Sequence, residues 1–137
     1  MKVLKENIES FIPQRAPFIM IDNLVDATMD VFFTNFKILP DNIFVENGRL
    51  REFALIENIA QSCSVGIAVT RFEKGKNIDG YIGSLSKLKL YALPKIFDII
   101  NTRIHLLAQL NNMYLLKGEN FVDGKLLLEC ELKLAGK

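Results

Sequence analysis

The stretch FALIENIAQSC, residues 53–63, is mostly apolar but contains a glutamate, Glu57, and a glutamine, Gln61. From Leu50 to about Phe72 the chain has neither proline nor an alternation of period two, and apolar residues occupy most of the helical circumference. This pattern predicts a long helix that is surrounded by protein on most sides. Glu57 and Gln61 are four residues apart, so they lie on one helical face. A buried carboxylate is costly unless it is paired or used, which makes Glu57 the first candidate for function.

Helical geometry places Glu57 on a short polar stripe. At about 100° per residue, the stripe is polar over only about two turns, whereas a solvated face normally carries lysine or arginine and extends further. Two readings stay open: Glu57 forms an ion pair with Arg49, Arg51 or a neighbouring subunit, or it lines a substrate pocket. The stripe comprises Phe53, Glu57, Gln61, Ser64 and Ala68, and Leu55, Ile59, Ser62 and Gly66 lie opposite it.

The segments around this helix predict an antiparallel sheet. A short helix is expected around residues 6–10, followed by strands at 18–25 and 30–39 and a turn at Asn47-Gly48. After a loop at 74–80 the pattern changes to alternation, at residues 100–110 and again at 126–134, with an Asp123-Gly124 hairpin turn before the latter. The expected order is two strands, one long buried helix and four antiparallel strands. A single helix facing a curved antiparallel sheet is an α+β architecture.

Composition limits the class of protein. The 137 residues suit a single domain, 1–137, and 50% hydrophobic with 24% charged residues is typical of a soluble globular protein. The net charge of +1 gives no sign of nucleic-acid binding, and the interrupted apolar runs predict no membrane span. No secretion signal is visible, and Cys63 and Cys130 have no metal-ligand spacing, so we expect reduced core thiols, no metal, no cofactor and a cytoplasmic location.

Four motifs, in this order and spacing, resemble the hot-dog fold, and more narrowly the β-hydroxyacyl-acyl carrier protein dehydratases. IPQRAPFIMID (12–22) is similar to the family's opening Leu-Pro-His-Arg-x-Pro-Phe stretch, with Gln14 at the histidine. ENIAQ (57–61) is similar to the Glu-Ala-Met-Ala-Gln of the central helix. YIGSLSKLKL (81–90) and the late VDGK hairpin (122–125) also fit. The resemblance covers nearly the whole chain and implies a long central helix wrapped by a curved antiparallel sheet.

The largest departure concerns the catalytic histidine. The family carries it in Gly-His-Phe-Pro-Gly, whereas this chain has FVENGRLREF (44–53), without histidine or proline and about four residues shorter. Asn47 stands nearest the histidine position, and the one histidine, His105, is expected on the polar face of a strand. The resemblance implies that Glu57 is the catalytic carboxylate, with Asn47 as a second catalytic candidate. It implies substrate contacts from Gln61, Gly48, Phe53, Ser64 and Gly83.

Three functions follow from this reading. The first is a 3-hydroxyacyl-thioester dehydratase of fatty-acid, specialised lipid or polyene synthesis. The second is a catalytically deficient partner subunit of an active dehydratase. The third is a hot-dog thioesterase that uses Glu57. The expected substrate is an acyl carrier protein or coenzyme A thioester, bound in a tunnel beside the helix. Arg15, Lys87, Lys89 and Lys95 are candidates for docking an acidic carrier. We expect a homodimer or a heterodimer with another hot-dog chain, or a higher oligomer, because the helix is apolar nearly all round and the sheet has an open edge.

Overall fold

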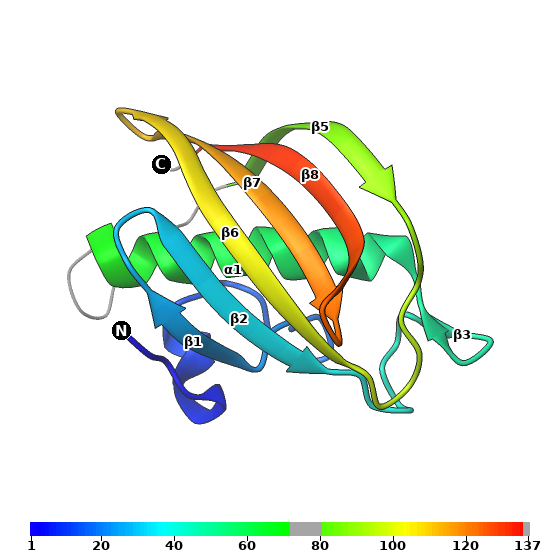
Figure 1. Cartoon of the computed structure of the whole chain (residues 1–137). Coiled ribbons are helices and arrows are strands. Elements are labelled where there is room, and N and C mark those ends of the chain that lie inside the picture. The colour runs from blue at the N-terminus through cyan, green and yellow to red at the C-terminus, as the bar shows by residue number, and fades with distance from the viewer. Residues whose placement is uncertain (72–80, 136–137) are drawn as a thin grey trace.

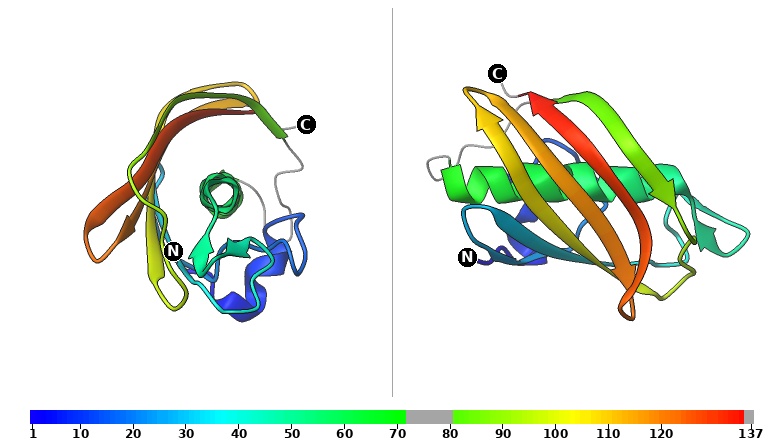
Figure 2. Two further views of the ribbon diagram at one scale, coloured as in Figure 1. Left: turned by 90° about the vertical axis from the view of Figure 1, so that its right-hand side faces the viewer. Right: turned by 45° about the horizontal axis from the view of Figure 1, so that its top comes forward.

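The computed structural model describes residues 1–71 and 81–135. One long helix, α1, lies in the concave side of a six-stranded antiparallel sheet that curves around it (Figures 1 and 2). The strand order is β1-β2-β6-β7-β8-β5, and a separate hairpin of β3 and β4 precedes the helix. The elements are η1 (Lys5–Ser10), β1 (Asn23–Ala27), β2 (Val31–Lys37), β3 (Val45–Glu46), β4 (Arg49–Leu50), α1 (Glu52–Arg71), β5 (Tyr81–Leu90), β6 (Ile99–Leu110), β7 (Met113–Val122) and β8 (Lys125–Ala135).

This arrangement confirms the predicted α+β hot-dog architecture, with one central helix and four antiparallel strands after it. The two predicted turns are also present, because both Asn47-Gly48 and Asp123-Gly124 have positive φ at each residue, as two-residue hairpin turns require. The loop predicted at 74–80 lies outside the described residues. The predicted core thiols, Cys63 and Cys130, are free and buried.

Close contact between α1 and the sheet depends on two glycines. A Cβ at Gly66 on the helix would lie 2.1 Å from Cδ2 of Phe32 on β2, and a Cβ at Gly118 on β7 would lie 2.3 Å from Cγ2 of Ile59 on the helix. Each glycine therefore leaves space that a large buried side chain of the facing element fills. The helical face with Ile59 and Gly66, which lies opposite the Glu57 stripe, points at the sheet.

A buried polar cluster also joins α1 to the sheet. The Oδ1 atom of Asn58 accepts hydrogen bonds from Oγ1 of Thr102 on β6 (2.5 Å) and from Nδ2 of Asn120 on β7 (3.0 Å). All three side chains are at most 2% exposed. Oδ1 of Asn120 has no partner among the described residues. The other hydrogen bonds of the cluster form only at one rotation and height of the helix on the sheet, so the cluster fixes both. The sequence motifs do not predict this cluster, and its one signal in the sequence is Asn58, an amide residue directly after Glu57 in an apolar helix.

The strand predicted at 18–25 begins later than expected, at Asn23. Residues 18–20 are bound by helix side chains instead of by a neighbouring strand. Nδ2 of Asn58 donates to the carbonyl of Met20 (2.7 Å), and the N–H of Met20 donates to Oε1 of Gln61 (2.7 Å). Because these side-chain amides pair with both the N–H and the carbonyl of Met20, the segment needs no neighbouring strand for its hydrogen bonds there.

By length and hydropathy alone α1 is a candidate membrane span, but 72% of its most apolar window is buried within the fold. The core helix of a soluble protein passes the same test. The burial therefore assigns α1 to the core.

Candidate active site

Glu57 lies in the second turn of α1 and is half-buried. The residues from Asn58 to Ala68 are all buried, whereas Glu52 and Phe53 in the first turn are exposed. Neither of the arginines considered as partners contacts its carboxylate: Arg49 donates to the carbonyl of Leu93, and Arg51 pairs with Glu46 and Glu52. Within residues 1–71 and 81–135 no ion pair of Glu57 is present, so a partner from a neighbouring subunit is the remaining structural reading.

Gln61 connects Glu57 to the segment of residues 18–20. Its Nε2 donates to Oε2 of Glu57 (3.0 Å) and to the carbonyl of Phe18 (2.9 Å), while its Oε1 accepts from the N–H of Met20. Gln61 is fully buried, and each end of its amide already has a protein partner. This arrangement orients one carboxylate oxygen of Glu57 and places the exposed Phe18 beside it. Gln61 therefore supports Glu57 from within the core. A residue that contacts substrate directly needs an accessible side chain, which Gln61 does not have.

Asn47 and Gly48 form the exposed turn between β3 and β4. Both have positive φ, at 53° and 78°, so the pair is the turn expected from the sequence. The hairpin projects beyond the N-terminal end of α1 (Figure 1). Asn47 makes no side-chain hydrogen bond with Glu57 in the part of the chain that the structure describes. The two catalytic candidates are therefore not brought together within one chain.

The other predicted substrate contacts are spread over the site. Phe53 is 56% exposed one turn before Glu57, and its ring packs on Phe44 with centroids 5.4 Å apart. Ser64 is buried and donates to the carbonyl of Ala60, so its hydroxyl is occupied within the helix. Gly83 lies in β5, on the strand at the edge of the sheet. Phe53 and Glu57 alone form a continuous accessible part of the predicted stripe.

His105 and most of the basic candidates lie away from this place. His105 is exposed on β6, on the outer face of the sheet, as its position in the alternation predicted. Lys87 pairs with Glu131 across β5 and β8, and Arg15 pairs with Glu9 at the surface. Lys95, in contrast, lies in the β5–β6 connection. Its backbone forms an isolated antiparallel β-bridge with the backbone of Arg49, just before α1. Of the predicted docking residues, Lys95 is therefore at the end of the molecule where the helix begins.

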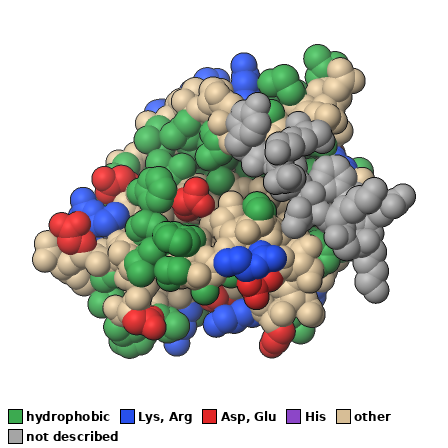
Figure 3. Space-filling model, turned by 180° about the vertical axis from the view of Figure 1, so that it is seen from behind, with side chains coloured by type: hydrophobic (Ala, Val, Ile, Leu, Met, Phe, Trp, Pro, Cys, Tyr) green, Lys and Arg blue, Asp and Glu red, His purple; other side chains and the backbone are tan. Residues whose placement is uncertain are grey.

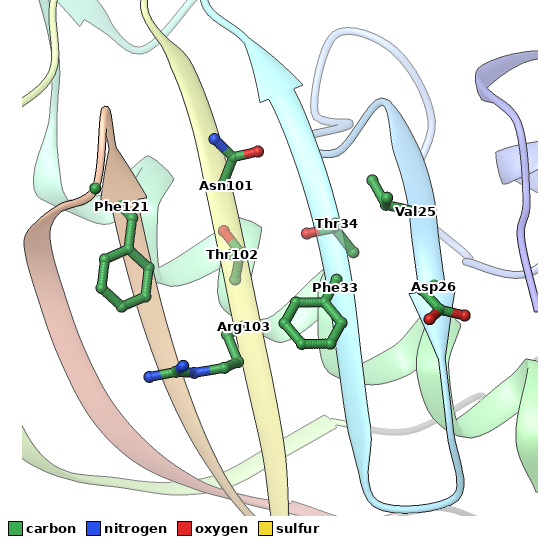
Figure 4. A pocket seen from close by; sticks show the side chains of 9 residues that line it. Val25, Asp26, Phe33, Thr34, Asn101, Thr102, Arg103 and Phe121 are labelled. Carbon is green, nitrogen blue, oxygen red and sulfur yellow. The ribbon is translucent and has the colours of Figure 1, made fainter.

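A groove of about 590 Å³ crosses the outer face of β1, β2, β6 and β7 (Figure 4). Arg103 lies in it, paired with Glu119 (2.9 Å) and stacked near the ring of Phe121. The neighbouring residues Ile100 and Ile104 point to the opposite face, toward α1. The sheet therefore separates this groove from Glu57, and the groove is not part of the candidate site.

The inner face of β5 is open. Its apolar residues Ile82, Leu85 and Leu90 pair across the ladder with buried leucines of β8, so they point to the helix side of the sheet, yet they are 36%, 39% and 46% exposed. The cause is the position of α1, which packs on the β1-β2-β6-β7 part of the sheet and leaves the far edge uncovered (Figure 2). Hydrophobic side chains gather over this side of the molecule (Figure 3). The concave side of the sheet, which holds α1, is thus left open along this apolar edge strand.

Comparison with known protein families identifies the family of this chain. A family model described as ApeP-like, ApeP dehydratase, matches residues 6–97. The chain belongs to the ApeP-like dehydratase family. Related sequences include the 3-hydroxyacyl-[acyl-carrier-protein] dehydratase FabZ of Wolinella succinogenes, 28% identical over 93% of this chain and 91% of the relative. FabZ of Oceanobacillus iheyensis is 25% identical over 96% and 97%. These findings confirm the predicted family and its dehydratase-like function.

Solved structures confirm the fold of this ApeP-like chain. The dehydratase heterocomplex ApeI:P from Xenorhabdus doucetiae matches with a TM-score of 0.82 and 15% identity, over 95% of this chain and 90% of that one. A hypothetical thioesterase with coenzyme A from Streptococcus pneumoniae matches with a TM-score of 0.69 and 10% identity, over 83% and 84%. The sequence relatives, however, are named dehydratases, so the thioesterase alternative fits less well than the dehydratase reading.

Proposed function

We propose that this chain acts on 3-hydroxyacyl thioesters as one subunit of a dehydratase, with Glu57 as its acid/base group and the histidine supplied by a second hot-dog chain. The observation that carries the proposal is the half-buried carboxylate of Glu57, oriented by Gln61 on the helix that the sheet encloses. An uncovered apolar strand, β5, at the edge of the same sheet adds support. The names of the relatives favour an acyl carrier protein as the carrier of the substrate. The related pathway is fatty-acid or specialised lipid synthesis, and the expected location is the cytoplasm.

The chemistry requires two functional groups. Dehydration removes a proton from Cα, expels the Cβ hydroxyl as water and leaves a double bond between them, so one group accepts a proton and another donates one. In this proposal Glu57 serves the leaving hydroxyl. The backbone N–H groups at the start of α1 can stabilise charge on the thioester carbonyl, where the helix dipole assists. Asn47 is not an acid or base near neutral pH, because its amide neither accepts nor gives a proton.

The second acid/base group has to come from a partner chain. His105, the one histidine in the sequence, is on the outer face of the sheet. A second hot-dog chain on the β5 edge would extend the sheet, cover Ile82, Leu85 and Leu90 with its own helix, and bring its own loop to Glu57. A solved structure with the same fold is the dehydratase heterocomplex ApeI:P, which supports assembly with a second chain.

The test compares the purified chain alone with its mixture with a histidine-containing hot-dog dehydratase that copurifies with it, identified by mass. We expect sedimentation to show a dimer or larger assembly. Dehydration of 3-hydroxyacyl carrier-protein substrates should be about 10²–10⁴-fold slower for the chain alone, since one positioned acid/base group is absent. A stable monomer at micromolar concentration even with the dehydratase present would contradict the assembly. Fast hydrolysis of acyl thioesters without dehydration would favour the thioesterase alternative.

A further inference from the structure

The end of the β6–β7 hairpin is an uncharged and largely apolar projection. Residues 106–116, LLAQLNNMYLL, contain no charged side chain. Leu107, Leu110 and Met113 in this run are 46%, 73% and 50% exposed. The hairpin end lies at the opposite end of the molecule from the β3–β4 hairpin (Figure 1). Single exposed apolar residues are ordinary, but three of them at one turn indicate an interaction surface.

A β-bulge brings these side chains to one face of the sheet. Leu106 packs against the core, and the register of β6 on β7 shifts at Leu107, the next residue, which points to the outer face. On β7, Met113 and Leu115 alternate with buried residues, so they share this outer face. Leu110 lies directly opposite Met113 in the last pair of the ladder and points the same way. We call Leu107, Leu110, Met113 and Leu115 the hairpin tip.

Lysines follow the hairpin tip on the same outer face. Lys117 comes two residues after Leu115 on β7, and Lys133 on β8 lies directly opposite Leu115. Lys133 is exposed and Lys117 is half-buried. Glu131 lies opposite Lys117, but its carboxylate pairs with Nζ of Lys87 (3.2 Å). The outer face behind the tip therefore carries a net positive charge.

Arg71, the last residue of α1, holds the other side of the hairpin tip. Its Nε donates to Oε1 of Gln109 on β6 (2.9 Å), and its Nη2 donates to the carbonyl of Met29 in the β1–β2 turn (2.7 Å). Asp30 in the same turn brings one negative charge, which the guanidinium of Arg71 offsets. The tip thus lies at the C-terminal end of α1, about 21 Å along the axis from Glu57 at 1.5 Å per residue.

We propose that the hairpin tip docks the protein on an anionic lipid surface. The apolar side chains enter the headgroup layer, and Lys117 and Lys133 lie beside the lipid phosphates. The uncharged run allows this entry without desolvation of an ion, and the lysines complement the negative surface potential of anionic lipid. The acid/base role of Glu57 is independent of this proposal. The end of α1 that carries Glu57 would face away from the lipid.

A second copy of this chain fits the hairpin tip less well. It would bring the same lysines to the contact, and like charges oppose such an association. The tip offers four apolar side chains, whereas a stable protein interface uses about 20–30 residues on each side. A lipid layer, in contrast, accepts a small apolar projection.

The test measures flotation of the full chain with vesicles of phosphatidylcholine and phosphatidylglycerol in equal parts, and with vesicles of phosphatidylcholine alone. We expect binding to the mixed vesicles and several-fold weaker binding to the neutral ones. Leu110→Ser and Met113→Ser together should lower the partition coefficient about tenfold or more, because the side chains that enter the lipid are lost. Leu39→Ser, at a leucine 43% exposed after β2, is the matched control and should bind unchanged. Tm should be nearly the same in all these variants, since the substituted side chains lie at the surface.

Charge variants test the lysines behind the tip. Lys117→Gln and Lys133→Gln should each weaken binding to the mixed vesicles several-fold, whereas Lys125→Gln, at the other end of β8, should not. No flotation with the mixed vesicles, or flotation that the double tip variant leaves unchanged, would overturn the proposal. Sedimentation of the lipid-free chain tests the protein alternative. A dimer that the tip substitutions dissociate would assign the tip to a protein contact and would also overturn lipid docking.

Discussion

Nε2 of Gln61 lies 3.0 Å from Oε2 of Glu57 and donates a hydrogen bond to it, one helical turn away on the same face. The same amide holds the backbone of Phe18 and Met20. The glutamine is therefore a link between the candidate acid/base group and the irregular segment beside it.

Glu57→Gln should abolish dehydration by the assembled enzyme while leaving stability nearly unchanged, because an amide keeps the shape but cannot transfer the proton. The measurements are steady-state turnover with the partner chain and urea unfolding of the variant. Glu119→Gln on the outer face of the sheet is the control and should retain turnover. A loss of several kcal/mol of stability in Glu57→Gln would instead identify half of a buried ion pair.

Gln61→Ala should destabilise the fold by about 1–3 kcal/mol, because the N–H of Met20 and the carbonyl of Phe18 lose their partners in a buried place. Gln109→Ala, at an exposed position on β6, should cost much less. Chemical denaturation of both variants gives the comparison. Equal, small effects would show that Gln61 does not support residues 18–20.

Asn58→Ala should cost about 2–3 kcal/mol, since it leaves Thr102, Asn120 and the Met20 carbonyl without their shared partner. The double variant with Asn120→Ala should cost less than the sum of the two single variants. A coupling energy of about 0.5–3 kcal/mol is expected for residues in one network. Strict additivity in this double-mutant cycle would show that the buried amides act independently.

Gly66→Ala should destabilise the protein by about 1–3 kcal/mol or more, because the added methyl would lie 2.1 Å from the buried ring of Phe32. Gly83→Ala is the matched control: its nearest neighbour, the carbonyl oxygen of Lys133, is 3.5 Å away, which is ordinary contact. Thermal unfolding measures both. Adding Phe32→Leu to Gly66→Ala should recover part of the loss, and a silent Gly66→Ala would contradict the close helix–sheet contact.

The two thiols should resist modification in the native state. Burial raises the pKa of Cys130 to about 11, and burial also raises the pKa of Cys63 well above its usual range. At pH 8 a thiol reagent should therefore react with neither until the chain is unfolded, and then with both. Because the unfolded thiols ionise first, stability should fall as pH rises through the ordinary thiol pKa toward 11. Fast native labelling at pH 8 would show that the interior opens readily.

The sequence by itself determined the elements and their order. The helix at 52–71 follows from an apolar circumference without proline, and β6 and β8 follow from their alternation. The turns at Asn47-Gly48 and Asp123-Gly124 follow from residue types that tolerate positive φ. These features depend on local geometry, which a single stretch of chain carries in its own pattern.

The tertiary structure alone decided which side chains meet. The buried polar cluster joins residues up to 62 positions apart, since it contains Asn58, Thr102 and Asn120. The hydrogen bond from Asn58 to the carbonyl of Met20 takes the place of the strand pairing that the sequence predicted there. The open inner face of β5 likewise depends on where distant elements lie. Periodicity reports which face of an element is apolar, but it carries no information about the position of the facing element. The helix lies off the centre of the sheet, and that placement leaves the inner face of β5 uncovered.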